Sequence, residues 1–475
     1  MKTLMVPTVA AEIDVKNKGR DENEKTPHPM LKLALIWYKR GDIENAIKSF
    51  RGVLQLDSDD VIAHAYLAML LLKQNKPAEA LEHLRTVIHL RPEDQETQKE
   101  VGFLERLVNP PSATERSSSW KSNPAGKLKF RDPRDWSIHR SGWGMGMAAL
   151  KPLHNHDGIL FDGFLEDLFS WQHKRDDIRP ADELLQLFRD QEFEYLATSE
   201  EKGLTPYHEP WGGFFHNPPH MPSWFHGNES PRSILDKPVM QRSLPYCRGL
   251  FALSEYHADW LRKETGKVVS SLILPTEIPN SQFEFDKFMQ NRDKRVVQIG
   301  WWLRQQTAIY QLPIWEDNPL GYTKMRLVPK FFDGAETYLQ SLLELEMSRF
   351  DVKLTGRNLV KQTQLSNHAY DWLLTENVVF LSLFDASANN TVVECIARAT
   401  PLLVNRHPAV IEYLGEDYPL FYGDFKDAAA KLLDVERLKA AHVYLKECPT
   451  RQKLSADYFR NAFEQSEVYS LLETV

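Results

Sequence analysis

The chain has 475 residues and a formal net charge of −8, with 42% hydrophobic and 26% charged residues. This composition is ordinary for a globular protein, and the length exceeds what one core usually supports, so we expect two or three domains. The negative charge does not favour a nucleic-acid partner, and no apolar run reaches the roughly 20 residues of a transmembrane segment.

The first 26 residues hold one early lysine, a short apolar run broken by Pro7 and an Ala-Ala pair, which is a poor signal peptide. We expect residues 1–26 to form a disordered start. The three cysteines, Cys247, Cys395 and Cys448, are odd in number and lack metal-ligand spacing. These features predict a cytoplasmic protein with reduced thiols.

Residues 27–60 and 61–94 align with each other at a period of 34 residues. The pairs in register are Gly41 with Asn75, Ala46 with Ala80, Phe50 with Leu84, Leu56 with Leu90, and Asp60 with Asp94. The pattern resembles the tetratricopeptide repeat, in which small residues let paired helices approach. Residues 95–108 have helical spacing and would cap the second repeat, so we expect a helical module over 27–108. It would serve either as a spacer or self-association surface, or as a groove for a partner protein.

Residues 109–135 are rich in Pro, Ser and charge, and predict a linker. From Trp136 onward, short apolar runs alternate with longer helical patterns, which is typical of parallel sheets. The clearest predicted strands are 249–254, 295–302, 351–356, 377–384 and 401–405. Prolines and charge interrupt the alternation at 272–294, so we expect an α/β fold with two doubly wound units over 136–280 and 281–425, followed by helices over 426–475.

The segment "DASANNTVVECIARATPLLV", residues 385–404, places polar side chains where a buried helix begins near Thr391. The first amides of a helix lack internal partners and lie at the positive end of its dipole, so they suit a phosphate or pyrophosphate. Glu394, one turn in, would accept hydrogen bonds from sugar hydroxyls. A structural alternative is a capping box of Thr391 with Glu394, with Asn389 or Asn390 holding a tight turn.

Part of this segment, "ECIARATPLLVN", is similar to the E-A-x-A-x-G-x-P-V segment of retaining GT-B glycosyltransferases. Glu394, Ala397, Thr400 and Pro401 stand in matching places. Three further stretches resemble that family in chain order, namely "RGLFALSEYHADWL", "LILPTEIPNSQFEF" and "AVIEYLGEDYPLFYGD". Together they cover about residues 245–425.

The resemblance implies two Rossmann-like domains facing a cleft, with an acceptor domain at 136–280 and a nucleotide-sugar donor domain at 281–425. The helices of 426–475 would return to brace the first domain. The donor's pyrophosphate would lie on Asn389, Asn390 and Thr391, and Glu394 would bind the ribose.

Arg304, in "IGWWLRQQ", matches the basic residue that neutralises the diphosphate in that family, and Arg357 after "KLTG" is a second candidate. An arginine suits this role because it carries a permanent charge and several donors. With an arginine and a helix terminus available, the resemblance requires no metal and no cofactor besides the donor.

The sequence departs from the family eight positions before Glu394, where a glutamate is usual and Ala386 stands here, with Asp385 beside it. Either Asp385 substitutes through a shifted loop, or the usual contact with the donor sugar is absent. His216, in "GGFFHNPPHMPSWFHG", would orient the donor sugar or assist a proton transfer, or only cap a strand end. Gly144, in "SGWGMG", would let the backbone approach a ligand, or belong to a turn.

The sequence thus predicts a glycosyltransferase that moves a sugar from a nucleoside diphosphate to a glycan or protein acceptor. The repeat module would recruit the acceptor, another protein or a second copy of the chain. Peptide O-GlcNAc transferases have a similar order of repeats and GT-B core. The alternative is a catalytically inactive GT-B fold that acts as a binding scaffold, which the alanine at position 386 keeps open.

Overall fold

The structure is a computed structural model that divides into two compact units. The first contains Met1–Glu115, Pro279–Gln282 and Gln364–Thr375, and the second contains Arg116–Ile278, Phe283–Thr363 and Glu376–Val475. The described residues are 29–40, 42–74, 76–92, 94, 97–98, 101, 104–105, 120–130, 142–169, 207–327, 335–352, 354, 359–362, 365 and 367–472. The expected disordered start lies outside these residues.

The first unit contains four helices that follow the predicted repeat, two in each repeat. The helices are α2 (Pro29–Lys39), α3 (Ile43–Leu56), α4 (Val61–Lys73) and α5 (Pro77–Leu90). The equivalent residues Asp60 and Asp94 make the same hydrogen bond. Ala63 N–H donates to Asp60 Oδ1 at 2.8 Å, and Thr97 N–H donates to Asp94 Oδ1 at 3.0 Å. The 34-residue period therefore extends to the helix caps.

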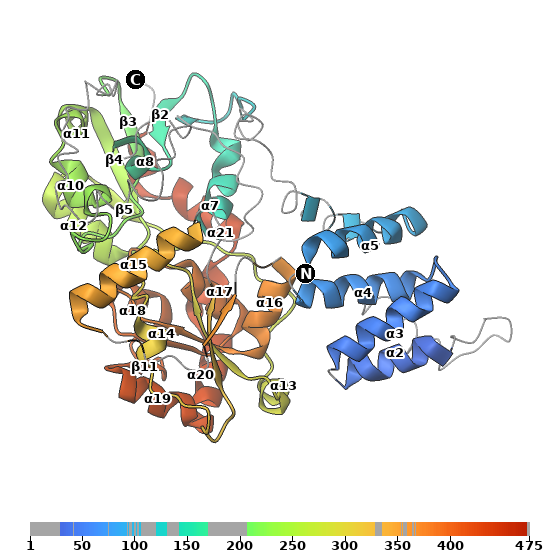
Figure 1. Cartoon of the computed structure of the whole chain (residues 1–475). Coiled ribbons are helices and arrows are strands. Elements are labelled where there is room, and N and C mark those ends of the chain that lie inside the picture. Colours follow the sequence, from blue (N-terminus) through green and yellow to red (C-terminus); the bar gives the residue numbers. More distant parts are fainter. Residues whose placement is uncertain are drawn as a thin grey trace. The chain divides into compact units, whose positions relative to one another are not determined.

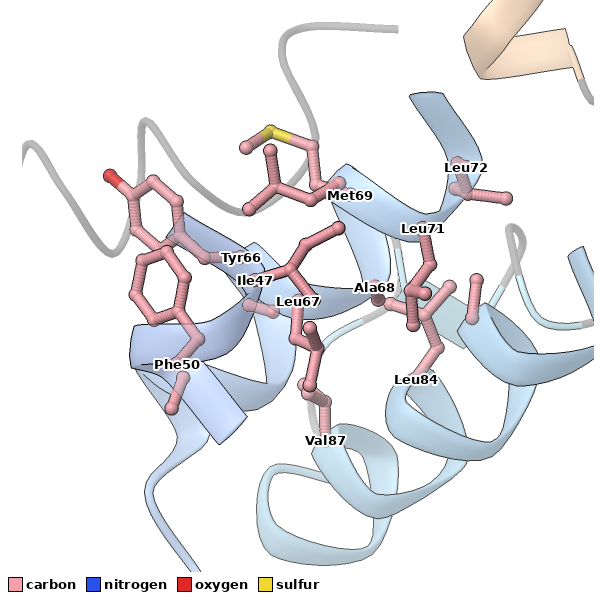
Figure 2. Packing of buried hydrophobic residues seen from close by; sticks show 14 of the residues in the cluster. Ile47, Phe50, Tyr66, Leu67, Ala68, Met69, Leu71, Leu72, Leu84 and Val87 are labelled. Carbon is pink, nitrogen blue, oxygen red and sulfur yellow. The ribbon is translucent and has the colours of Figure 1, made fainter. Parts of the chain in front are cut away.

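The core of this unit surrounds α4, which is buried along most of its length (Figure 2). Ala46 and Ala80 are completely buried, as the repeat pattern predicts. The ring of Phe50 stacks on that of Tyr66, with centroids 5.2 Å apart. Val101 and Leu104 in the following helical residues join this core, and Trp372 of α16 (Asn367–Glu376) also packs against it.

The second unit contains a first parallel sheet in which the strands follow chain order. The strands are β1 (Leu128–Phe130), β2 (Ile159–Asp162), β3 (Trp211–Phe214), β4 (Cys247–Ala252) and β5 (Val269–Ser271). β1 corrects the sequence prediction, because it lies inside the expected linker 109–135. Its three residues alternate buried, exposed and buried, a signal too short to stand out among the charged residues around it.

Short helices surround this first sheet (Figure 1). They are α7 (Gly142–Leu150), η1 (Lys151–Leu153), α8 (Leu165–Phe169), η2 (Gly227–Glu229), α10 (Pro231–Leu235), α11 (Pro238–Ser243), η3 (Leu244–Tyr246) and α12 (Glu255–Thr265). In the stretch "SGWGMG", Gly142 already begins α7. Gly142, Gly144 and Gly146 therefore lie in a helix and not in a glycine-rich loop.

A second sheet of six strands has the order β11-β10-β9-β6-β7-β8, and all neighbours are parallel. The strands are β6 (Arg295–Ile299), β7 (Thr323–Leu327), β8 (Leu359–Gln362), β9 (Val378–Leu381), β10 (Leu402–Asn405) and β11 (Phe421–Tyr422). The chain builds outward from β6 in one direction and then returns to build from β9 in the other. This is the doubly wound arrangement of Rossmann-type sheets, with its switch point between β6 and β9.

One predicted strand of this sheet is described only in part. Residues 351–356 were expected to be extended, and the prediction is wrong at Asp351, which lies in a turn with a φ of 50°. The strand that the structure describes nearby is β8, and residues 353 and 355–358 lie outside the described residues.

Helices cover the second sheet, and the chain then returns to the first. The helices are α13 (Phe285–Gln290), α14 (Ala308–Gln311), α15 (Ala335–Phe350), α17 (Asn390–Arg398), α18 (Pro408–Leu414), α19 (Phe425–Leu433), α20 (Val435–Glu447), η4 (Pro449–Lys453), α21 (Ala456–Glu464) and α22 (Glu467–Leu471). α19 packs on β11 and α20 on α17, whereas α21 packs beside α7 and α22 on β4 (Figure 1). Within 426–475, the helices from Ala456 onward therefore pack against the first sheet and α7. None of the described helices combines the length and apolar character needed to cross a membrane.

Candidate functional site

The candidate site lies where the chain leaves β6 and β9, the two neighbouring strands at the switch point of the second sheet. The loops that follow these strands are bound to each other. Gln305 N–H donates to Ser382 O at 2.8 Å, and Phe384 N–H donates to Leu303 O at 2.9 Å. Ligands of open α/β sheets bind outside the carboxyl ends of the strands at such a point.

Arg304 reaches from the loop after β6 to the beginning of α17. Its Nη2 donates to Asn389 Oδ1 and to Thr391 Oγ1, each at 3.2 Å, and Nη1 donates to Trp302 O at 2.9 Å. The side chain folds back over Gly300, where an added Cβ would lie 2.8 Å from Arg304 Cζ. The structure thus brings together three residues that the sequence predicted to share a site.

Asn389 is the N-cap of α17. Its Oδ1 accepts the N–H groups of Thr391 at 3.0 Å and Val392 at 3.3 Å. The alternative of a capping box of Thr391 with Glu394 is therefore wrong, because Asn389 is the N-cap and Thr391 lies inside the helix. The extended backbone at Asn389 directs its side-chain amide toward the first N–H groups of the helix. Together with Arg304, the two amides give Asn389 Oδ1 three donors, which is the environment of an anionic oxygen.

Asn390 lies beside the beginning of α7. A Cβ added to Gly142 would lie 2.4 Å from Asn390 Oδ1, and Gly142 has a φ of 66°, so a glycine is needed there on both counts. Gly144 is buried inside α7. The close approach in "SGWGMG" is between Gly142 and the side chain of Asn390, and the expected approach of Gly144 to a ligand stays a prediction.

Asp385 connects the loop after β9 to three other elements. It is almost completely buried. Its Oδ1 accepts from Tyr256 Oη at 3.0 Å and from His407 Nε2 at 2.9 Å, and its Oδ2 accepts from His220 N at 2.6 Å. Tyr256 and His220 follow strands of the first sheet, so Asp385 fastens the loops of the two sheets to each other. Neighbouring Ala386 is also buried.

A second contact of this kind joins His257 on α12 to Ser387. His257 Nδ1 lies 2.8 Å from Ser387 Oγ, and the histidine is completely buried. Burial lowers the pKa of His257 from its ordinary value of 6.5 to about 3, against an opposing attraction from Asp385. His257 is therefore neutral in the folded protein at physiological pH.

His216 follows β3 and is held by the buried carboxylate of Glu166. Glu166 Oε1 accepts the N–H groups of His216 at 2.6 Å and Asn217 at 2.7 Å, and Oε2 lies 3.4 Å from His216 Nδ1. The imidazole contacts the rings of Trp143 and Phe164, with centroids 4.1 and 4.5 Å away. We assign the proton to Nδ1, facing the carboxylate, which leaves Nε2 as an acceptor.

His216 Nε2 is buried and has no hydrogen-bond partner among the residues that the structure describes. Glu166 escaped the sequence analysis. The available signal was an acidic residue inside the apolar run "FLEDLF", where a buried carboxylate must have donors to accept from.

Two further predicted residues are Glu394 and Arg357. Glu394 is buried one turn into α17. Arg357 lies outside the described residues. The aromatic residues near His216 in the sequence, Trp211, Phe215 and Trp224, lie in hydrophobic cores.

The stretch "HNHD", residues 154–157, has the residue types of metal ligands. His154 is buried, and its Nδ1 accepts the N–H of Phe130 at 3.2 Å. Among the described residues, no group of three or more histidine, cysteine, aspartate or glutamate side chains is arranged for a metal ion.

The family model of the tetratricopeptide repeat matches residues 38–99. This stretch is a tetratricopeptide-repeat module. The model covers only this part of the chain, and the predicted repeat is thereby confirmed. No curated protein matches the chain.

Several solved structures match more distantly. Trehalose-6-phosphate synthase OtsA is 14% identical, with a TM-score of 0.43 over 70% of this chain and 76% of that chain. The structure described as "Trehalose-6-phosphate from E. coli bound with UDP-2-fluoro glucose" is 13% identical, with a TM-score of 0.42 over 70% of this chain and 77% of that chain. The UDP-forming α,α-trehalose-phosphate synthase from Burkholderia vietnamiensis is 13% identical, with a TM-score of 0.41 and the same two shares. Because these TM-scores lie below 0.5, the matches support no conclusion about function.

Proposed function

We propose that the second unit is a glycosyltransferase that binds a nucleoside-diphosphate sugar at the switch point between β6 and β9. The observation that carries the proposal is the guanidinium of Arg304 at the beginning of α17, hydrogen-bonded to Asn389 and Thr391. A permanent cation and the positive end of a helix dipole add to each other in this buried setting. A diphosphate leaving group develops the charge that such a site stabilises.

Asn389 has a specific part in this proposal. Its amide oxygen now accepts from Arg304 Nη2, Thr391 N and Val392 N. A phosphate oxygen would use the same donors, so donor binding requires the Asn389 side chain to rotate away from them. The protein oxygen keeps the donors satisfied until the substrate arrives.

His216 and Asp385 have different parts. The acceptor nitrogen of His216, backed by Glu166, suits a hydroxyl of the donor sugar or of the acceptor, which it would orient or deprotonate. Asp385 already accepts from four other residues, so we assign it the positioning of the two loops and no contact with the sugar. Glu394 would bind the ribose, and Arg357 would be a second cation near the diphosphate.

The proposal includes the remaining parts of the chain. With Arg304 and α17 binding the diphosphate, the reaction needs no metal ion. The acceptor would be a glycan or a protein, and the repeat module would recruit that acceptor, another protein or a second copy. A cytoplasmic location fits three free, buried cysteines.

The test is turnover of a panel of UDP-, GDP- and ADP-linked sugars, measured as nucleoside diphosphate released with and without added glycan or peptide acceptors. Arg304→Ala is expected to lower kcat/KM for the active donor about 100-fold, the usual effect of removing one charge-stabilising donor. Arg437→Ala, which removes an exposed arginine of α20 paired with Asp434, is the matched control. Equal activity of both variants would exclude Arg304 from the site.

A binding scaffold without catalysis is the second candidate. The observation that favours it is that the protein itself satisfies both Asp385 and the first amides of α17. Thermal unfolding with UDP, GDP and ADP, combined with the turnover assay, separates the two. A bound nucleotide at a hundred times its Kd adds about 2.7 kcal/mol to stability. Binding without turnover of any donor, or no binding at all, would favour the scaffold.

A further inference from the structure

The direction of Arg304 is set by a turn rather than by a regular element. Between β6 and Arg304 the backbone is left-handed at two positions, Gly300 with a φ of 78° and Leu303 with a φ of 55°. Leucine is rarely stable in this conformation, so the turn needs support from its surroundings. The side chain of Gln306, which is only 1% exposed, lies against the turn.

Gln306 ties the two ends of this turn together. Its Nε2 donates to Trp301 O at 2.9 Å and to Arg304 O at 2.7 Å. One amide thus bonds to the carbonyl where the turn begins and to the carbonyl of the arginine itself. Rotation of the Arg304 backbone would break at least one of these bonds inside a buried region.

The orientation of the Gln306 amide is itself fixed. Its Oε1 accepts from Arg326 Nη2 at 2.7 Å, and Arg326 is a buried residue of β7. A flipped amide would place its NH2 group against a guanidinium and its oxygen against two carbonyls, so only one orientation is compatible with the contacts.

The backbone that follows the turn is held from a third element. Glu346 on α15 accepts the N–H groups of Gln306 at 2.8 Å and Thr307 at 2.9 Å, and also the hydroxyl of Thr307. The carboxylate is 1% exposed. β7 therefore acts on the turn through Gln306, whereas α15 acts through both Gln306 and Thr307.

We propose that Gln306 is a positioning residue for Arg304 and therefore for the diphosphate of the donor. The inference rests on the proposed function. Gln306 holds the turn in the conformation that directs the guanidinium to Asn389 and Thr391 before any ligand binds. Binding then needs no ordering of this loop, which is the advantage of a preorganised site.

The experiment uses two variants of the full chain. Gln306→Met removes all polar contacts of the side chain at similar volume. Gln306→Glu retains an oxygen that faces Arg326 and removes both donors to the turn. Gln311→Met is the matched control, because Gln311 Nε2 donates to Thr307 Oγ1 and does not contact the turn.

Calorimetry measures the Kd of UDP, GDP and ADP below the Tm of every variant. For the nucleotide that the native protein binds, both Gln306 variants are expected to bind about 10- to 100-fold more weakly, the scale expected for a misplaced binding group. The control is expected to bind within about twofold of the native protein. Introduced in the background of Arg304→Ala, the Gln306 changes are expected to have almost no further effect, because they act through that arginine.

Native affinity in both Gln306 variants, or losses that add in full to that of Arg304→Ala, would overturn the positioning role. A purely structural role predicts this additive result together with a lower Tm. If native protein binds a nucleotide and Arg304→Ala weakens it, the proposed function survives even when the Gln306 variants bind normally. If native protein binds none of the three nucleotides, both proposals fail together.

Discussion

The two parallel sheets of the second unit differ in the order of their strands. In the first sheet the described strands follow chain order from β1 to β5, so every crossover steps in the same direction. In the second sheet the order reverses at β6 and β9. Only at such a reversal do neighbouring loops leave the sheet on opposite sides and open a place for a ligand. The cation and the helix terminus of the candidate site both stand there.

The first sheet contributes to the same site in a different way. The loop after β3 supplies His216 and His220, α12 after β4 supplies Tyr256, and two of these residues bind Asp385 of the second sheet. In the proposed function, the second sheet binds the ligand, and the first sheet supplies hydrogen-bonding groups and the contacts that fasten the two sheets together. We call this the division of labour between the sheets. Variants that act on one sheet, or on the contacts between the two, test this division.

The largest effect is expected where the sheets are joined. Asp385→Ala leaves Tyr256 Oη, His220 N and His407 Nε2 without their buried acceptor, so we expect a loss of about 3–5 kcal/mol in the free energy of unfolding. Urea unfolding monitored by tryptophan fluorescence measures it. Asp457→Ala, at an exposed position of α21, is expected to change stability by less than about 0.5 kcal/mol. A loss below about 1 kcal/mol for Asp385→Ala would show that the sheets are held together elsewhere.

A smaller effect is expected where α22 covers the first sheet. A Cβ added to Gly249 of β4 would lie 2.8 Å from Val468 Cγ1, so Gly249→Ala is expected to cost about 1–3 kcal/mol through overpacking. The double variant Gly249→Ala with Val468→Ala should recover part of that loss, because the clashing methyl groups are gone.

Gly423→Ala is the control for this change, since nothing lies within 4 Å of its added Cβ. An equal loss in the single and double variants would mean that the cost comes from the strand backbone and not from α22.

The neutral His257 between α12 and Ser387 predicts a pH dependence. Its pKa is lowered to about 3 in the folded protein, whereas the unfolded chain has the ordinary value near 6.5. The unfolded state therefore binds more protons between these values, and stability should fall as pH decreases from 6.5 toward 3. His257→Gln should reduce this slope in urea unfolding at a series of pH values, and His208→Gln, at an exposed site, should leave it unchanged. An unaltered slope in His257→Gln would assign the acid sensitivity to other groups.

Local patterns predicted most of the fold. The 34-residue period predicted the helices of the repeat, and the alternation of apolar runs predicted β4, β6, β9 and β10 within a few residues. β1 was missed because a strand of three residues has little periodicity of its own and is fixed by its neighbours in the sheet.

The site was predictable only in part, for a related reason. Arg304, Asn389 and Thr391 follow strands, so the topology of a parallel sheet brings them together. Glu166 and Gln306 are defined by which backbone groups they satisfy after folding. Such partners come from distant segments, and no spacing in the sequence announces them.

The smallest predicted effect compares two buried tyrosines. Tyr413 Oη donates to Leu253 O at 2.7 Å and accepts Leu274 N–H at 2.9 Å, which joins α18 to the first sheet, whereas Tyr322 Oη is buried without a partner among the described residues. Tyr413→Phe should cost about 1–3 kcal/mol because two buried groups lose their partner. Tyr322→Phe should change the free energy of unfolding by less than about 1 kcal/mol, since no bond is lost. If urea unfolding gives equal losses of unfolding free energy for Tyr413→Phe and Tyr322→Phe, the hydrogen bonds of Tyr413 Oη contribute no more to stability than the hydroxyl of Tyr322.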